Sequence, residues 1–204
     1  MDVMDAIQKR RSIRHFKPDD IPNDVLERLL NAMRLAPSGE NRQPWKFIVV
    51  RDKTTKYKVA ATCIWKTSDG KQVLQKWINE APVIIVACGF EKEASVRYYK
   101  KGELIITDWA SLEAEMQQTT IEYESSLVSD LTIAIDHLTL AARAEGLGTC
   151  WLGSMKEPQV KEILSIPKDV RAPLAVVLGY PMSWPNSRPR KSINEIICYD
   201  KYSN

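Results

Sequence analysis

The 204-residue sequence has few of the side chains that carry out chemistry without help. It contains only His15 and His137, and its four cysteines are far apart, with no Cys-x-x-Cys pair. This scarcity argues against a zinc site and against a disulfide framework. Neither histidine lies in a recognisable nucleophile motif, which disfavours a Ser–His–Asp or Cys–His arrangement. We therefore predict no metal ligand and no catalytic side chain, and expect any enzymatic chemistry to come from a cofactor.

The sequence also lacks a long apolar run and a strong net charge. Its longest apolar run, Pro82 to Cys88, is far shorter than the ~20 residues of a membrane-spanning helix. Met1 to Asp5 is acidic and lacks the apolar stretch of a signal peptide, so we expect a cytoplasmic protein without membrane contact. The net charge of +3 is too small to argue for nucleic acid as a partner.

The positive charge is concentrated toward the two ends of the sequence. Residues 1–60 carry 13 basic and 8 acidic side chains, residues 61–130 carry 7 and 11, and the remainder carry 9 and 7. This distribution suggests local anion sites more than one basic face.

Length and composition indicate a single globular domain spanning residues 1–204. Apolar residues spaced three and four apart predict helices at 22–35, 127–144 and 157–164, with Gly146 ending the second. Short β-branched runs predict strands at 46–51, 82–89 and 174–179. Because residues 82–89 are apolar throughout, we expect a central strand that is covered on both faces. One central sheet with helices, α/β or α+β, is predicted.

Two segments do not fit a simple monomer. Residues 62–126 are rich in Trp and Tyr, yet they are acidic and weakly periodic, and they could cover a site. Residues 181–204 begin with three prolines and end in apolar side chains, so they form an extended tail that could lie across a partner subunit. Both segments could equally pack on their own domain.

Basic residues form two short clusters. In the first, Arg10, Arg11 and Arg14 surround Ser12. Arginine presents N–H groups that match phosphate oxygens, and a serine hydroxyl adds a neutral donor. The alternatives are a solvated basic stretch and a nucleic-acid patch. The second cluster, residues 188–191, could likewise be a solvated tail.

Two loops contain residues that could approach a flat ligand. In residues 36–45, two prolines and Gly39 fix the loop, and Ser38 and Asn41 can present polar groups. Residues 146–154 are glycine-rich but do not form a dinucleotide fingerprint, because they follow a helix and Trp151 replaces the third glycine. The simpler interpretations are an ordinary structured loop and a helix end followed by a buried strand.

Taken together and in this order, these clusters resemble the nitroreductase family of FMN-dependent oxidoreductases. The resemblance extends from about Asp5 to Tyr199 and is carried by residues 10–14, 36–45, 141–149 and 190–191. It implies an α+β fold, a three-layer sandwich with a central, mainly antiparallel sheet flanked by helices. It further implies an intertwined homodimer with one FMN in each of two clefts between subunits, the tail wrapping the partner and residues 62–126 setting substrate specificity.

The resemblance also implies which residues contact FMN. Arg10, Ser12 and Arg14, with Arg11 beside them, match the contacts to the phosphate, ribityl chain and pyrimidine edge. Pro37, Ser38, Gly39 and Asn41 match a loop under the flavin that comes from the other subunit. Leu152 and Gly153, preceded by Cys150 and Trp151, match residues whose backbone N–H groups lie near flavin N5, and Arg190, with Arg188 or Lys191, matches a second phosphate anchor.

The implied reaction is a ping-pong transfer of two electrons from NADH or NADPH, through FMN, to a flat small-molecule acceptor such as a nitroaromatic or a quinone. Donor N–H groups and positive charge beside the flavin would stabilise its reduced form. Aromatic residues of 62–126 could form a lid over such an acceptor or pack as core. Alternatives are another flavin reaction of the fold, such as reductive dehalogenation or flavin destruction, and a flavin-binding module without turnover.

Overall fold

The computed structural model describes residues 1–203. Its central sheet has four strands in the order β1–β4–β9–β8, and every neighbouring pair is antiparallel. The strands are β1 (Trp45–Val50), β4 (Val83–Phe90), β9 (Val170–Gly179) and β8 (Gly148–Leu152). β4 lies inside the sheet and is buried from Val83 to Gly89, as its uninterrupted apolar sequence predicts.

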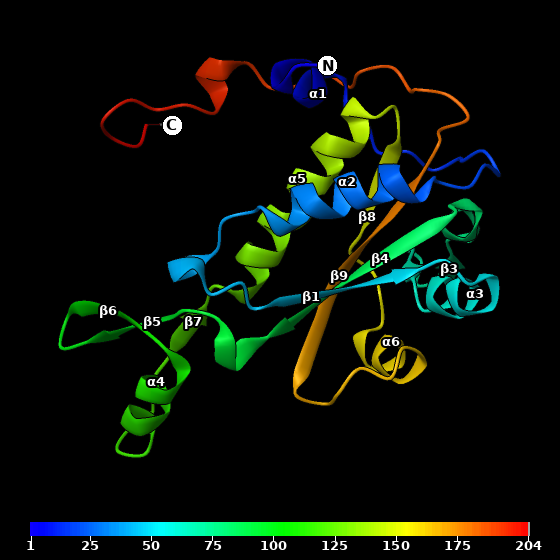
Figure 1. The fold of residues 1–204 in the computed structure, drawn as a ribbon. Coiled ribbons are helices and arrows are strands. Elements are labelled where there is room, and N and C mark those ends of the chain that lie inside the picture. Colours follow the sequence, from blue (N-terminus) through cyan, green and yellow to red (C-terminus); the bar gives the residue numbers. More distant parts are fainter. Residues whose placement is uncertain (204) are drawn as a thin grey trace.

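Helices cover both faces of this sheet, which gives three layers (Figure 1). The helices on one face are α2 (Asn23–Arg34) and α5 (Leu127–Ala144), and those on the other are α3 (Lys53–Ala61) and α6 (Glu157–Ile163). Side chains alternate along a strand, so β4 contributes to both cores. Ile84, Val86 and Cys88 enter the α3/α6 core, and Val83, Ile85 and Ala87 enter the α2/α5 core. The predicted three-layer α+β architecture is confirmed.

Helix α5 has the predicted bounds and ends in a Schellman motif. Gly146 adopts φ +79° and donates its N–H to the Arg143 carbonyl at 3.2 Å, while Leu147 N–H donates to the Ala142 carbonyl at 2.8 Å. At 1.5 Å per residue, the 18 residues of α5 span about 27 Å. Segments attached to its two ends are therefore well separated.

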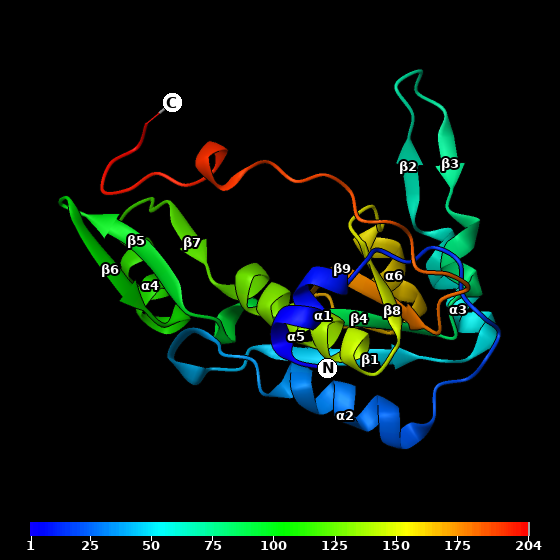
Figure 2. The same cartoon turned by 90° about the horizontal axis from the view of Figure 1, so that it is seen from above.

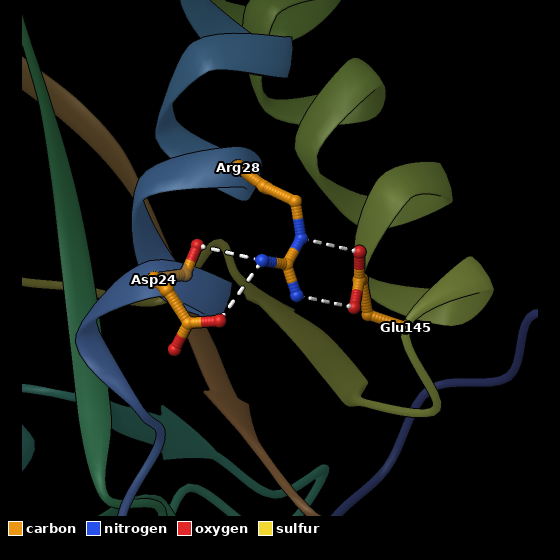
Figure 3. A network of polar contacts seen from close by, with 3 residues as sticks. All are labelled: Asp24, Arg28 and Glu145. Carbon is orange, nitrogen blue, oxygen red and sulfur yellow. Dashed lines mark hydrogen bonds and ion pairs between the residues drawn. The ribbon is translucent and has the colours of Figure 1, made fainter.

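The C-terminal end of α5 is tied to α2 by Arg28 (Figure 3). Its Nε and Nη2 donate to the two carboxylate oxygens of Glu145 at 2.8 and 3.0 Å, and its Nη1 donates to Asp24 Oδ2 at 3.0 Å. The hydrogen bonds from Arg28 lower the pKa of both carboxyl groups.

Because these pKa values are lowered in the folded protein, the ion pairs stabilise it above the ordinary carboxyl pKa of about 4, and the contribution is lost as the pH falls through the lowered values. We expect Arg28→Ala to reduce the free energy of unfolding more at pH 7 than at about pH 3, by a small amount because the groups are exposed. Urea unfolding at both pH values measures this. Arg34→Ala, whose side chain bonds only to the neutral Asn31, is the control. An equal cost for Arg28→Ala at both pH values would contradict the expectation.

Residues 62–126 do not form one unit, because β4 lies between two peripheral parts. Before β4 is a hairpin of β2 (Ile64–Lys66) and β3 (Gln72–Leu74), followed by the short helix η2 (Lys76–Glu80). After β4, residues 95–126 form what we call the peripheral unit. It contains β5 (Val96–Lys100), β6 (Glu103–Thr107), α4 (Trp109–Met116) and β7 (Tyr123–Ser125), with a sheet in the order β6–β5–β7. Figure 2 shows the hairpin and the peripheral unit at opposite ends of the molecule.

The C-terminal segment is extended, as predicted. It begins beside the N-terminal segment, where Met182 N–H donates to the His15 carbonyl at 3.0 Å, and Trp184 stacks on Arg143 at 3.8 Å. Residues 182–203 are all exposed, including the apolar side chains of Ile193, Ile196 and Ile197. This tail therefore carries an apolar surface that its own domain does not cover.

Candidate functional site

Residues 10–14 lie along the outer edge of β8. Ser12 forms a parallel bridge with Thr149, and the N–H of the buried Ile13 donates to the Thr149 carbonyl at 2.9 Å. This close approach requires glycine at position 148, because a Cβ there would lie 2.4 Å from Ile13 Cγ1. Contact between Ile13 and Gly148 thus positions the first basic cluster against the sheet.

Three of the predicted contact residues influence the thiol of Cys150, the next residue of β8. Burial raises the pKa of the Cys150 thiol, while the charge of Arg14, a hydrogen bond with Ser12 and the charge of Arg10 act in the opposite direction. Ser12 and Arg14 are exposed and Arg10 is half-buried. Within residues 1–203, no carboxylate forms an ion pair with either arginine. Their uncompensated charge makes this edge suitable for an anion.

Arg11 is oriented differently from its neighbours. Its Nη1 donates to the carbonyl oxygens of Gln8 and Arg10 at 2.7 and 2.8 Å, at the C-terminal end of α1 (Val3–Lys9). These bonds satisfy carbonyl groups that a helix end leaves without partners. The structure therefore gives Arg11 a helix-capping role, and its predicted contact with FMN remains a prediction.

Alternation along β8 decides which groups of residues 150–153 can face a ligand. The side chains of Cys150 and Leu152 are buried in the α3/α6 core, and Trp151 packs against the α2/α5 core. Because the Thr149 carbonyl faces residues 10–14, the antiparallel pattern directs the Trp151 N–H to the same edge and the Leu152 N–H toward β9. Gly153 is exposed, and a Cβ there would meet no atom within 4 Å. Backbone groups of Trp151 and Gly153 thus border an open edge.

Gln75, just before η2, and Trp77, within η2, also lie at this edge. Gln75 Nε2 donates to Ser154 Oγ at 2.9 Å, and the guanidinium of Arg14 lies 5.7 Å from the centroid of the Trp77 ring, within cation–π range. The sequence offered no signal for Gln75 and marked Trp77 only as one of several aromatic residues. These contacts hold the base of the β2–β3 hairpin, with its 54% exposed Trp65, next to the basic cluster.

Residues 37–39, which we call the flavin loop, lie at the other end of α5. Gly39 N–H donates at 3.3 Å to Oδ1 of Asp130, in the first turn of α5. The basic cluster instead lies beside β8, which follows the last turn, so the helix from Asp130 to Ala144, about 21 Å long, separates the two. In Figure 1 the loop, between α2 and β1, is on the opposite side from β8. One chain does not bring these two predicted parts of the site together.

The flavin loop and the residues after it are held by polar contacts. Ser38 Oγ accepts the Gln43 N–H at 2.9 Å, and the exposed Asn41 adopts a left-handed conformation with φ +56°. Gly39 allows Ser95 to pack closely, since a Cβ on this glycine would lie 2.7 Å from Ser95 Oγ and 3.1 Å from Ser95 Cβ. Its close contact is therefore with the protein itself, whereas the sequence suggested only an approach to a ligand.

The second basic cluster lies on the exposed tail. A bridge between Phe16 and Pro181 places the start of the tail beside the residues that follow Arg14. Arg188 and Arg190 are exposed a few residues further along. The start of the tail therefore lies beside the first basic segment. The guanidinium groups of Arg188 and Arg190, however, lie on a part of the tail that does not pack on its own domain.

Most aromatic residues of the peripheral unit pack within it. Tyr98 is buried, and the rings of Trp109 and Tyr123 make an edge-to-face contact with centroids 5.5 Å apart. Tyr99, by contrast, is 72% exposed. Core packing therefore accounts for three of the aromatic residues that were candidates for a lid.

Comparison with known proteins identifies the class to which this fold and site belong. The profile of the nitroreductase family matches residues 7–180. A Thermus thermophilus protein named NADH dehydrogenase is 29% identical over 89% of this chain and 87% of its own. The FMN reductase (NAD(P)H) of Bacillus subtilis is 28% identical over 100% and 75%. An iodotyrosine deiodinase of Thermotoga neapolitana is 23% identical over 96% and 95%.

A solved structure agrees with these sequence matches. The crystal structure of a nitroreductase family protein from Clostridium novyi NT has a TM-score of 0.69 and 28% identity, covering 89% of this chain and 87% of that one. Because the family profile spans most of the sequence, this chain belongs to the nitroreductase family, a family of oxidoreductases. The resemblance drawn from the sequence is confirmed. No helix within residues 1–203 has the length and apolarity to cross a membrane.

Proposed function

We propose that this protein is an NAD(P)H oxidoreductase that holds FMN at the edge of β8 and reduces a flat acceptor such as a nitroaromatic or a quinone. The observation that carries the proposal is the uncompensated group of Arg10, Ser12 and Arg14 beside the open edge at Gly153. A cytoplasmic location, expected from the sequence, is part of the same proposal. The relative named FMN reductase (NAD(P)H) supports the choice of cofactor and electron donor.

The residues at this edge fit FMN. Arg10, Ser12 and Arg14 would hold its phosphate and neighbouring polar atoms, because charge-assisted hydrogen bonds from arginine suit phosphate oxygens. The backbone N–H groups of Trp151 and Gly153 would face the flavin ring. Bound FMN would supply two-electron redox chemistry between NADH or NADPH and the acceptor. Donors and positive charge around the ring favour the reduced, anionic cofactor, and no acid or base side chain is required.

A second copy of the chain would complete the site. The flavin loop lies about 21 Å of helix away from the basic cluster of its own chain, so we propose that the loop and Asn41 act in the cleft of the other subunit. The exposed apolar side chains of the tail are consistent with a homodimer in which the tail lies on the partner. In that dimer, Arg188 and Arg190 would supply the second phosphate anchor.

An absorbance spectrum of the purified protein tests the proposed function. We expect a yellow protein whose visible flavin absorbance is bleached by anaerobic NADH or NADPH and is restored by a nitroaromatic or a quinone. Free FMN with the same nicotinamide, without protein, is the control. A protein that binds FMN and is not bleached would be a flavin-binding module, and one that does not take up FMN would contradict the proposal. Restoration by a halogenated aromatic alone would favour reductive dehalogenation.

A further inference from the structure

Asp130, in the first turn of α5, lies where the flavin loop meets the N-terminal end of this helix. Its side chain is buried, with the residue 4% exposed, and each carboxylate oxygen accepts one hydrogen bond. Oδ1 accepts the Gly39 N–H at 3.3 Å, and Oδ2 accepts from Ser126 Oγ at 2.7 Å. One side chain of α5 therefore holds both the flavin loop and the last residue of the peripheral unit.

Ser95 and Ser126 form the neck of the peripheral unit. They are its first and last residues, and Ser126 N–H donates to the Ser95 carbonyl at 2.9 Å. Gly39 lies against both, since a Cβ on it would be 2.7 Å from Ser95 Oγ and 3.5 Å from Ser126 Oγ. We call Gly39, Ser95, Ser126 and Asp130 the neck junction. Hydrogen bonds join Gly39 to Asp130, Asp130 to Ser126, and Ser126 to Ser95, so a shift of the loop would disturb the neck.

The backbone after Gly39 has a strained conformation that contacts with the rest of the protein must hold in place. Glu40, Asn41 and Gln43 have φ values of +50°, +56° and +51°, a region that non-glycine residues seldom occupy. Conformations of this kind persist where surrounding contacts hold them in place. The bond from Gly39 to Asp130 attaches this strained segment to α5. A second contact, from Ser95 Oγ to Glu40 Oε2 at 3.3 Å, attaches it to the neck.

We propose that Asp130 is a positioning residue that couples the flavin loop to the peripheral unit, so that FMN held by the loop orders the unit and fixes the shape of the acceptor side of the cleft. The inference rests on the proposed function, because the loop reaches FMN only in the dimer described above. The coupling is reciprocal: an ordered peripheral unit raises the affinity for FMN to the same degree.

Hydrogen–deuterium exchange of the full-length protein, with and without FMN, tests this coupling. In the wild-type protein, FMN is expected to slow amide exchange in β5 and β6 by about fivefold or more, although these strands lie outside the basic cluster. Asp130→Ala leaves the Gly39 N–H and the Ser126 hydroxyl without their acceptor. We expect it to weaken FMN binding by about tenfold or more. In this variant, FMN should no longer slow exchange in the two strands.

Three variants separate positioning from a general effect on stability. Asp130→Asn keeps an oxygen that can accept from Gly39, so it should restore most of the FMN affinity and of the FMN-dependent protection. Asp136→Ala, on the same helix, removes a carboxylate that accepts only from Thr139 of α5, and should behave like wild type. If Asp130→Ala does not fold, Ser126→Ala removes only the donor to Oδ2 and should show the same pattern more weakly.

The outcomes distinguish this inference from the proposed function. Wild-type protein that binds FMN with no change of exchange in β5 and β6 would overturn the coupling and leave the proposed function standing. An Asp130→Ala protein that retains both wild-type FMN affinity and wild-type protection of β5 and β6 would likewise overturn the coupling. Wild-type protein that does not bind FMN would overturn the proposed function, and this inference with it.

Discussion

Replacing Arg10 and Arg14 together by alanine is expected to leave a folded protein that no longer retains FMN. Their segment lies along the outer edge of β8, and within residues 1–203 neither arginine forms an ion pair, so the fold loses little besides the cation–π contact of Arg14 with Trp77. Each charge-assisted hydrogen bond to a phosphate contributes about 1.5–3 kcal/mol. Losing two such contacts weakens binding by about 100-fold to 10⁴-fold.

Fluorescence titration of the cofactor-free protein with FMN measures this effect. Arg34→Ala combined with Lys46→Ala removes the same charge from exposed positions elsewhere and should leave FMN affinity unchanged. Arg188→Ala with Arg190→Ala tests the tail separately, and a weaker affinity is expected if the tail supplies the second anchor. Wild-type FMN affinity in the Arg10→Ala/Arg14→Ala protein would contradict the assignment of the phosphate site.

The second large effect is expected from Gly148→Ala. The added Cβ would lie 2.4 Å from Ile13 Cγ1 and 2.8 Å from Ile13 Cβ, so residues 10–14 would have to move away from β8. Overpacking of a buried contact costs about 1–3 kcal/mol. Because the displaced segment carries Ser12 and its arginine neighbours, FMN affinity should fall together with the free energy of unfolding. Denaturant unfolding and FMN titration measure the two quantities.

Gly153→Ala is the matched control for stability, because a Cβ at that position meets no atom within 4 Å. Combining Gly148→Ala with Ile13→Ala removes both Cγ atoms of the clashing side chain. The combined cost should therefore be smaller than the two single costs added together, as expected for residues in contact. A Gly148→Ala protein as stable as wild type would show that the strand pairing at Ser12 and Thr149 is not needed.

Elements with a strong local pattern could be predicted from the sequence, whereas elements held by long-range contacts could not. α5 follows from its apolar periodicity, and β4 from its unbroken apolar run. α3 was not predicted, because its buried face includes Lys56, whose amine donates to the Ala81 carbonyl at 2.6 Å. The peripheral unit escaped prediction because its small core is shared among short strands and α4.

The sequence by itself determined the residue types of the site and the class of chemistry. Scarce histidine and scattered cysteine pointed to a cofactor, clustered arginine pointed to an anion site, and the order of the motifs, which resembles the nitroreductase family, pointed to FMN. Tertiary structure decided which of these residues meet. It placed the segment of Arg10 and Arg14 along the edge of β8, used Arg11 to cap α1, and placed the flavin loop at the far end of α5. The physical reason is that periodicity encodes only which face of an element is apolar. Which distant segments touch is set by packing, as between Ile13 and Gly148.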